Sequence, residues 1–163
     1  MRDDEPGARP GPLPLKELLR PVRPLRTTDT IAEAARRVSE SGGGLPVVDE
    51  EDRLVGYLGE RDRLGAICPG YLRDLRDTEF LTRDLSTLAR WARDASETPV
   101  ARHMTRDPAS VEEDDSEMHA AELFLHSGLR SLPVVTRDRR VLGVVRLGDL
   151  IADLMGRVAD GGG

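Results

Sequence analysis

The sequence has little of several residue types on which small proteins often depend. Cys68 is the single cysteine among 163 residues, so an intramolecular disulfide and a cysteine-based zinc site are both excluded. Aromatic residues make up only 3% of the chain, and a core must therefore be built from Leu, Val, Ile and Ala. No apolar run is long enough to cross a membrane, and residues 1–5 do not resemble a signal peptide. We expect a soluble cytoplasmic protein without a membrane partner.

Positive charge comes almost entirely from arginine, because Lys16 is the only lysine. Arginine suits phosphate and carboxylate contacts, but a G+C-rich genome gives the same bias, which is the interpretation we favour. The net charge is −6 and 33% of residues are charged. An acidic chain with scattered arginines opposes binding to a phosphate backbone, so no nucleic-acid partner is expected.

An internal repeat with a constant offset of 87 residues is the most informative feature. The repeated pairs are Leu45–Val48 with Leu132–Val135, Gly56 with Gly143, and Asp62 with Asp149. One supersecondary unit therefore occurs twice in the sequence. Such a repeat is stronger evidence for a fold than any single motif. Two copies of one unit usually pack together and leave two related clefts between them. This favours a binding module over a catalytic centre.

The first copy reads as helix, strand, strand, helix. A capping box at residues 30–33 opens a helix that ends near Ser41. Its predicted inner face comprises Ile31, Ala34, Ala35 and Val38. Strands are predicted at residues 45–48 and 54–58, a short helix at 60–67, and an extended lead-in at 22–25.

The second copy follows the same order. Ser116 caps a predicted helix that runs through His126, and its inner face would include Met118, Ala121 and Leu125. Strands are predicted at 132–135 and 141–145, a last helix from near Gly148, and an extended lead-in at 108–111. The predicted class is therefore mixed α/β (α+β), with two pseudo-symmetric units.

The boundaries follow from these patterns. We predict a disordered lead at 1–14, unit 1 at 15–68, a helical insert at 69–99, unit 2 at 100–157 and a flexible tail at 158–163. The insert holds apolar residues at helical spacing and should form two helices. Its apolar side chains Phe80, Leu81, Leu85, Leu88 and Trp91 either cover the core or contact a second subunit.

The order of these motifs resembles the cystathionine-β-synthase (CBS) domain, and two units in tandem resemble a Bateman module. Residues 100–108 add to the resemblance, because many CBS units open with a similar Met-Thr and Pro stretch. The likeness covers roughly residues 18–154 apart from the insert. It implies a two-unit disc whose clefts often hold AMP, ADP, ATP or S-adenosylmethionine, and it implies that two discs pair as a homodimer.

The resemblance also implies roles for particular residues. Ligand-binding members use an Asp at the first turn of the final helix for the ribose hydroxyls, and Asp62 and Asp149 hold this position. A carboxylate can accept from two neighbouring hydroxyls at once. The alternative is a carboxylate that caps the helix. Three residues earlier the family usually has Ser or Thr for a phosphate, whereas this chain has Gly59 and Arg146; Arg146 either binds phosphate or points to solvent.

The second copy has the more complete polar set, so we expect its cleft to dominate. Immediately before or at the repeated Leu-Pro-Val-Val stretch it has Arg130 and Ser131, where the first copy has only Gly44 and its neighbours. Those glycines either cradle a phosphate or simply end a helix. The residues expected to surround an adenine ring are Thr105, Pro108, Ala109, Val111 and Val144, with first-copy counterparts near Arg23 and Leu25.

Catalytic and metal patterns were weighed against these motifs. His119, Glu122 and His126 recur at helical spacing, but a solvated helix face explains them better than a metal site. No nucleophile elbow or paired acid and base is present in the sequence. We therefore expect a non-enzymatic sensor that binds an adenine nucleotide, needs no obligatory cofactor, forms a homodimer and signals to a separate effector protein. The alternative is a ligand-free module for dimerisation or protein interaction.

Overall fold

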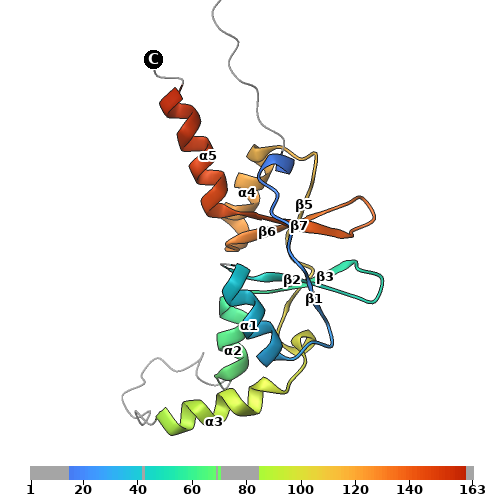
Figure 1. Cartoon of the computed structure of the whole chain (residues 1–163), viewed down its shortest axis with the longest axis vertical. Helices are drawn as coiled ribbons and strands as arrows, with labels where there is room; N and C mark the ends of the chain where they lie inside the picture. Colours follow the sequence, from blue (N-terminus) through green and yellow to red (C-terminus); the bar gives the residue numbers. More distant parts are fainter. Residues whose placement is uncertain (1–14, 42, 69, 71–84, 161–163) are drawn as a thin grey trace, which may run out of the picture.

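Two small α/β units are stacked one above the other in the computed structural model, which describes residues 15–160 except 42, 69 and 71–84 (Figure 1). The expected disordered lead and half of the insert lie outside the described residues. The expected mixed α/β class with two related units is confirmed. Residues 158–160 of the expected tail are helical, because the last helix extends to Asp160.

The first sheet has the strand order β1-β2-β3-β4. It joins β1 (Leu25–Arg26), β2 (Leu45–Val48), β3 (Leu54–Leu58) and β4 (Thr105–Arg106), and its helices are α1 (Ile31–Ser41) and α2 (Glu60–Ile67). The second sheet has the order β5-β6-β7. It joins β5 (Val111–Glu112), β6 (Ser131–Val135) and β7 (Val141–Arg146), with α4 (Glu117–Ser127) and α5 (Leu147–Asp160). Two short 3-10 turns lie at Leu15–Glu17 and Val100–Arg102.

The predicted helix starts are confirmed by their caps. The Thr30 hydroxyl accepts from the Glu33 N–H at 3.3 Å, while the Glu33 carboxylate accepts from the Thr30 N–H at 2.9 Å. These contacts lower the pKa of Glu33. Ser116 accepts from the His119 N–H at 3.1 Å. Both helices thus satisfy N–H groups that have no partner within the helix.

The predicted inner face of α4 is confirmed for Ala121, which packs against the core of unit 2, but is wrong for the other two residues. Met118 and Leu125 are 78% and 84% exposed, whereas Glu117, Ala120 and Phe124 are buried. The helix carries apolar residues on more than one side, so periodicity alone allowed two orientations. The buried orientation packs the large ring of Phe124 into the core and brings Glu117 within 2.6 Å of Arg157 on α5.

Each unit borrows a segment from the other end of the chain. Leu15, with Leu18 and Leu19, packs into the core of unit 2, although these residues are the first of unit 1 in the sequence. In return, Val100 and Met104 pack into the core of unit 1. Backbone pairing follows the same exchange, because β4 pairs with β3 and Arg20 bridges to Val144 of β7. The chain therefore crosses between the units twice.

The repeated glycines permit these crossings. A Cβ on Gly56 would lie 3.1 Å from the Thr105 carbonyl oxygen, and closer still to Met104. A Cβ on Gly143 would lie 2.3 Å from the Arg20 carbonyl oxygen. Both positions therefore need glycine so that the borrowed segment can approach the strand closely.

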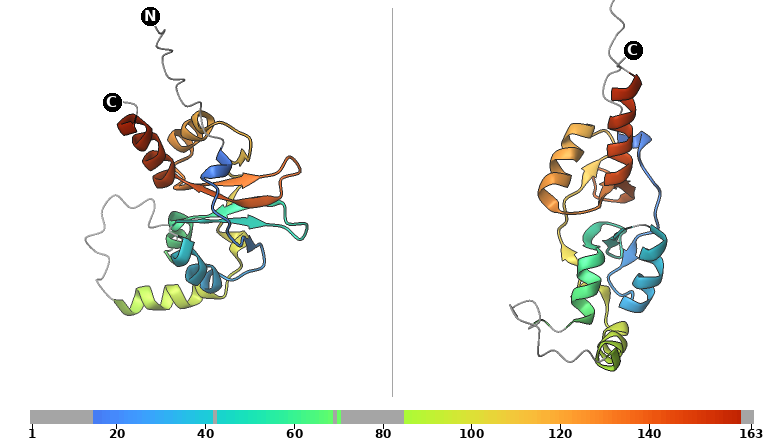
Figure 2. Two further views of the ribbon diagram at one scale, coloured as in Figure 1. Left: turned by 45° about the horizontal axis from the view of Figure 1, so that its top comes forward. Right: turned by 90° about the vertical axis from the view of Figure 1, so that its left-hand side faces the viewer.

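The described part of the insert contains one helix, α3 (Leu85–Ser96), which packs against α2 and α1 beneath unit 1 (Figure 2). Ala95 is buried, Trp91 is partly buried and Leu88 is 46% exposed. The second predicted helix and the residues Phe80 and Leu81 lie outside the described residues. Within that part of the chain, α3 serves as a cover for unit 1.

Candidate functional site

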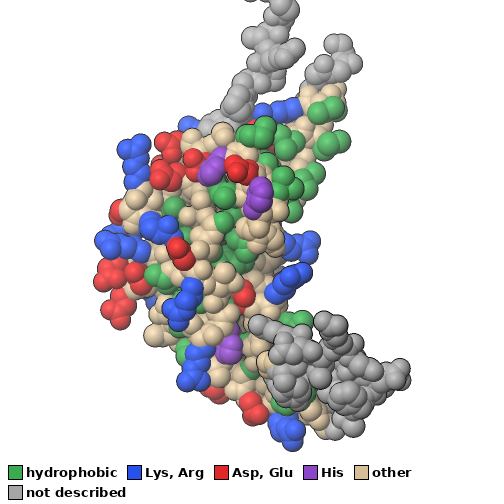
Figure 3. All heavy atoms as spheres, turned by 180° about the vertical axis from the view of Figure 1, so that it is seen from behind, with side chains coloured by type: hydrophobic (Ala, Val, Ile, Leu, Met, Phe, Trp, Pro, Cys, Tyr) green, Lys and Arg blue, Asp and Glu red, His purple; other side chains and the backbone are tan. Residues whose placement is uncertain are grey.

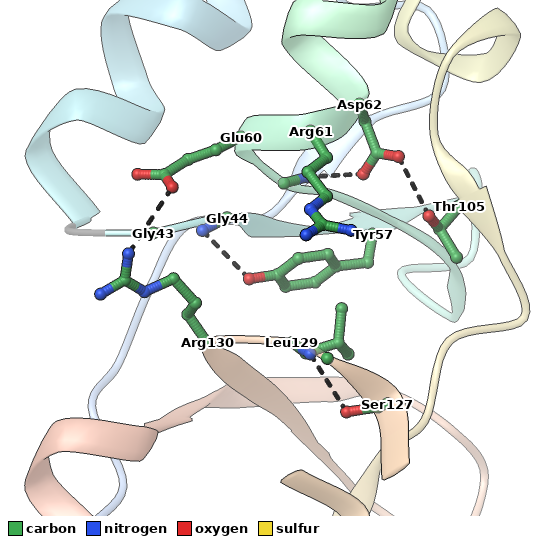
Figure 4. Close-up of a pocket in the computed structure, with 12 residues that line it drawn as sticks. Gly43, Gly44, Tyr57, Glu60, Arg61, Asp62, Thr105, Ser127, Leu129 and Arg130 are labelled. Atoms are coloured by element: carbon green, nitrogen blue, oxygen red, sulfur yellow. Dashed lines mark hydrogen bonds and ion pairs between the residues drawn. The ribbon is translucent and has the colours of Figure 1, made fainter. Parts of the chain in front are cut away.

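A cleft of about 440 Å³ lies between the two units (Figure 4). We name it cleft 1. Its walls come from the β2 start, the β3–α2 junction, β4 and the α4–β6 connection, so both units contribute. The lining residues are Gly43, Gly44, Tyr57, Gly59, Glu60, Arg61, Asp62, Thr105, Ser127, Gly128, Leu129 and Arg130.

Asp62 is fixed at one end of cleft 1 by two hydrogen bonds. Its Oδ2 accepts from the Gly59 N–H at 2.8 Å, which closes the first turn of α2. Its Oδ1 accepts from the Thr105 hydroxyl at 3.1 Å. A carboxylate has about four acceptor sites, so these two bonds leave capacity for the hydroxyl groups of a ligand.

A buried tyrosine joins the units behind the cleft. The Tyr57 hydroxyl accepts from the Gly44 N–H at 3.0 Å and lies 2.8 Å from the Ser131 hydroxyl. The ring occupies the space above Gly44, where an added Cβ would lie 2.3 Å from it. Burial raises the pKa of Tyr57 above its ordinary value of 10.0. The phenol is therefore a neutral wall of the cleft at physiological pH.

The opposite end of cleft 1 carries Arg130 and Glu60, and Arg61 lies between the two ends. Arg130 Nη1 lies 3.8 Å from Glu60 Oε2 across the mouth of the cleft. Figure 4 shows Arg61 extending from α2 toward Tyr57. Both arginines are exposed and able to meet an anionic group. The cleft thus offers a hydroxyl acceptor at one end, the Arg130 guanidinium at the other, and the Arg61 guanidinium between them.

The aspartate of the second copy has a different environment. Arg20 approaches Asp149 with both ends of its guanidinium: Nε lies 2.5 Å from Oδ2 and Nη2 lies 3.0 Å from Oδ1. The hydrogen bond from Arg20 lowers the pKa of Asp149. A depression of about 470 Å³ beside this pair, which we name cleft 2, is lined by Glu17, Leu18, Leu19, Arg20, Asp149, Ala152 and Asp153.

Cleft 1 brings together five of the residues that the sequence indicated as ligand contacts. They are Asp62, Gly59, Gly44, Thr105 and Arg130. The grouping of Thr105 and Arg130 with Asp149 was wrong. Because β4 crosses to β3 of unit 1, Thr105 reaches Asp62 instead, and Arg130 faces Glu60.

The other indicated residues lie outside cleft 1. Ser131 is buried against Tyr57, and Leu25, Val111 and Val144 lie in the two cores or strands at 0–1% exposure. Pro108 is buried and Ala109 packs against the core of unit 2. The Arg23 carbonyl oxygen accepts a hydrogen bond from the Arg37 guanidinium. Arg146 neither lines cleft 1 nor points wholly to solvent, because its Nε is buried without a partner in the described structure.

Among the lining residues that the sequence did not indicate, four carry the polar and aromatic groups discussed above: Tyr57, Glu60, Arg61 and Arg20. Tyr57 occupies a strand position that Val144 fills in the second copy, so a break in the repeat was the available signal. Glu60 and Arg61 are ordinary surface residues in the sequence. Arg20 belongs to unit 1 but precedes the motifs by which the repeat was recognised, and only the crossing of its segment brings it to Asp149.

The residues that the structure describes contain no group of three or more His, Cys, Asp and Glu side chains suited to a metal ion. His126 Nδ1 instead lies 2.8 Å from the Glu122 carbonyl oxygen within α4. Among the same residues, no helix has the length and apolar content that a bilayer crossing requires.

Comparison with known proteins agrees with the repeat and the fold. A CBS domain family model matches residues 15–68 and again residues 100–156. These two stretches make up more than half of the chain. This chain belongs to the CBS domain family. The predicted resemblance to a tandem CBS pair is thus confirmed.

Curated relatives of this CBS-pair chain are mostly longer. An uncharacterized 17.7 kDa protein of Acidianus ambivalens is 31% identical over 127 residues, which cover 77% of this chain and 63% of that protein. Inosine-5'-monophosphate dehydrogenase of Methanocaldococcus jannaschii is 29% identical over 124 residues, 76% of this chain but only 20% of the enzyme. The chain thus spans less than two thirds of these relatives, and CBS units occur inside enzymes as well.

Solved CBS-pair structures share the fold. The CBSX2 protein in complex with AMP has a TM-score of 0.64 and 22% identity, with 88% of this chain and 96% of that one covered. The CBS domain pair of protein MJ0100, in complex with 5'-methylthioadenosine and S-adenosyl-L-methionine, has a TM-score of 0.61 and 25% identity, with 89% and 97% covered.

Proposed function

We propose that this CBS pair is a regulatory module that binds an adenosine ligand in cleft 1 and transmits the bound state to a partner protein. The observation that carries the proposal is the Asp62 carboxylate, held by Gly59 and Thr105 in a cleft that both units build. The ligands considered are AMP, ADP, ATP and S-adenosylmethionine. The adenosine ligands of the MJ0100 pair support this class.

The chemistry of cleft 1 fits the two ends of such a molecule. Ribose hydroxyls would donate to Asp62, and Leu129 with the Tyr57 ring would provide apolar surface for the base. Arg130 at the other end, together with Arg61 between the ends, would meet a phosphate. Glu60 opposes a highly charged phosphate chain, which favours AMP over ATP.

The signal would arise from the geometry of the site. Asp62 and Tyr57 belong to unit 1, while Thr105, Leu129 and Arg130 come from segments of unit 2. A ligand that contacts both sets stabilises one relative arrangement of the units. Only a difference in ligand affinity between two arrangements can be transmitted to a partner. No catalytic turnover is proposed.

Isothermal titration with AMP, ATP and S-adenosylmethionine tests the proposal. Asp62→Asn should weaken AMP binding by about 1.5–3 kcal/mol, roughly 10- to 150-fold, because a charge-assisted acceptor is lost. Asp149→Asn is the matched control and should leave AMP affinity unchanged. Absence of binding for all three ligands would overturn the proposal, as would an effect of Asp149→Asn alone. Hydrolysis of ATP by the purified protein would contradict the non-enzymatic role.

A ligand-free interaction module is the second candidate. It is favoured by the exposed apolar side chains on α4 and α5, which are Met118, Leu125, Ile151, Leu154, Met155 and Val158. Figure 3 shows hydrophobic side chains gathered along the protruding α5. An apolar surface of this kind usually marks an interface.

A further inference from the structure

Arg20 and Thr105 hold equivalent positions in the two halves of the molecule. Thr105 pairs with Tyr57 of β3, and Arg20 bridges to Val144 of β7. Tyr57 and Val144 are themselves counterparts in the repeat, 87 residues apart. Each residue also contacts the aspartate that opens the following helix: Thr105 contacts Asp62, and Arg20 contacts Asp149.

Thr105 and Arg20 differ in how much hydrogen-bonding capacity they leave on the aspartate that each contacts. Thr105 donates one hydroxyl hydrogen bond to Asp62, which a ligand hydroxyl can add to or replace. The Arg20 guanidinium donates to both oxygens of Asp149 in a bidentate pair, which places a positive charge next to the carboxylate. The arginine thus supplies, from within the chain, the donors that a pair of vicinal hydroxyls would bring.

Arg20 is also held in place by its backbone. Its N–H donates to the Val144 carbonyl at 2.8 Å, and the Val144 N–H donates to the Arg20 carbonyl at 2.9 Å. Gly143 permits this approach, because a Cβ there would meet the Arg20 carbonyl oxygen. The backbone of Arg20 is therefore fixed beside β7, and its half-exposed side chain reaches Asp149 from there.

The charged neighbours of the pair differ from those of cleft 1. Glu17 and Asp153 line the same depression as Asp149, and Arg20 is the one arginine among its lining residues, although Arg157 pairs with Asp153 at 2.8 Å. Cleft 1 has two carboxylates and two guanidinium groups among its lining residues. In addition, Ser131, the repeat counterpart of Gly44, is engaged by Tyr57.

We propose that Arg20 occupies the hydroxyl-binding position of Asp149 and so closes this aspartate to a ligand, so that the chain binds one adenosine ligand, in cleft 1, instead of two. This inference rests on the proposed function of cleft 1. Arg20 acts as an internal substitute for a ligand. Replacing it by threonine, the residue at the equivalent position, opens the second site.

The test is the stoichiometry of AMP binding by calorimetry on the full chain. The wild-type protein should bind one AMP per chain, and Arg20→Thr should bind two. The double variant Arg20→Thr/Asp149→Asn should return to one, which locates the new site at Asp149. Lys16→Thr removes a positive charge from the same segment and is the matched control, with one AMP expected. Arg20→Gln gives a second variant should threonine unfold the chain, which thermal melting reports.

Each outcome separates this proposal from the function of cleft 1. Two AMP molecules on the wild-type chain, or one on both the wild type and Arg20→Thr, would overturn the closure by Arg20 while leaving the binding function intact. Two AMP molecules on the double variant would also overturn the closure. Binding by Arg20→Thr but not by the wild type would reject cleft 1 and keep the closure. No binding by either protein would reject both.

Discussion

The hydroxyl of Tyr57 in unit 1 lies 2.8 Å from the hydroxyl of Ser131 in unit 2. The same phenol accepts from the Gly44 N–H, and all three residues are buried. This contact closes the boundary between the units directly behind cleft 1. It therefore ties the cleft to the packing of one unit on the other.

Tyr57→Phe should lower the free energy of unfolding by about 1–3 kcal/mol, because the buried Gly44 N–H loses its acceptor. Ser131→Ala is the matched comparison and should cost less, since the Tyr57 hydroxyl still accepts from Gly44. Urea denaturation monitored by circular dichroism measures both. Equal stability of Tyr57→Phe and the wild type would show that the hydroxyl network contributes nothing.

Gly143→Ala should destabilise the protein by about 1–3 kcal/mol, because the added methyl group overlaps the Arg20 carbonyl oxygen. Gly148→Ala is the control: its Cβ meets nothing within 4 Å, and its position in α5 makes alanine neutral or stabilising by up to about 1 kcal/mol. Thermal or urea unfolding distinguishes the two variants. A neutral Gly143→Ala would argue against the close crossing of the Arg20 segment.

Arg157→Met should cost on the order of 3 kcal/mol at neutral pH, because it leaves the buried Glu117 carboxylate without its cation. Arg137→Met breaks a far more exposed ion pair with Glu112 and should change stability by less than about 1 kcal/mol. Denaturation curves of the two variants give the comparison. A smaller loss for Arg157→Met than for Arg137→Met would contradict the burial of this pair.

The stability contributed by Glu117 should depend on pH. Burial raises the pKa of Glu117 above its ordinary 4.5 despite Arg157, so the folded protein binds the proton more tightly than the unfolded chain. The stability of the wild type relative to Glu117→Gln should therefore be greatest below the ordinary pKa and fall as pH rises through the raised pKa. Urea denaturation at a series of pH values checks the direction. The opposite slope would indicate that Arg157 outweighs burial.

Glu60→Gln should strengthen AMP binding by up to about fivefold, because Arg130 loses a competing carboxylate and exposed ion pairs contribute at most about 1 kcal/mol. Glu50→Gln removes an exposed carboxylate from the β2–β3 turn and should leave affinity unchanged. Calorimetric titration at low salt measures the change. Weaker binding after Glu60→Gln would place the phosphate away from Arg130.

We propose that the homodimer forms through the exposed apolar side chains of α4 and α5 rather than through the insert alone. Ile151→Glu should then convert a dimer to a monomer, because it places a charge among apolar side chains at the interface. Light scattering after size exclusion measures the assembly. Leu64→Glu changes an equally exposed apolar residue on α2, and dissociation by that variant alone would move the interface to unit 1. A wild-type monomer at micromolar concentration would remove the dimer.

The sequence by itself determined the repeated architecture. Local signals were sufficient for the helix caps at Thr30 and Ser116, for the strands beginning near Leu45 and Leu132, and for the short helix after Gly59. Each of these depends on residues within one or two turns of each other. Local signals did not determine which face of α4 is buried. Its apolar residues fit two faces, and packing of Phe124 into the core of unit 2 selected one.

Only the tertiary structure decided which residues lie together in each cleft. The sequence placed Thr105 with Asp149 because both belong to the second copy, yet the crossing of β4 to β3 brings Thr105 to Asp62. The reverse crossing brings Arg20 to Asp149, across 129 residues of chain. A repeat predicts which residues are equivalent, because equivalent residues are separated by a constant offset along the sequence. It does not predict which copy a connecting segment pairs with, since that depends on backbone hydrogen bonds and core contacts formed only when the two units pack.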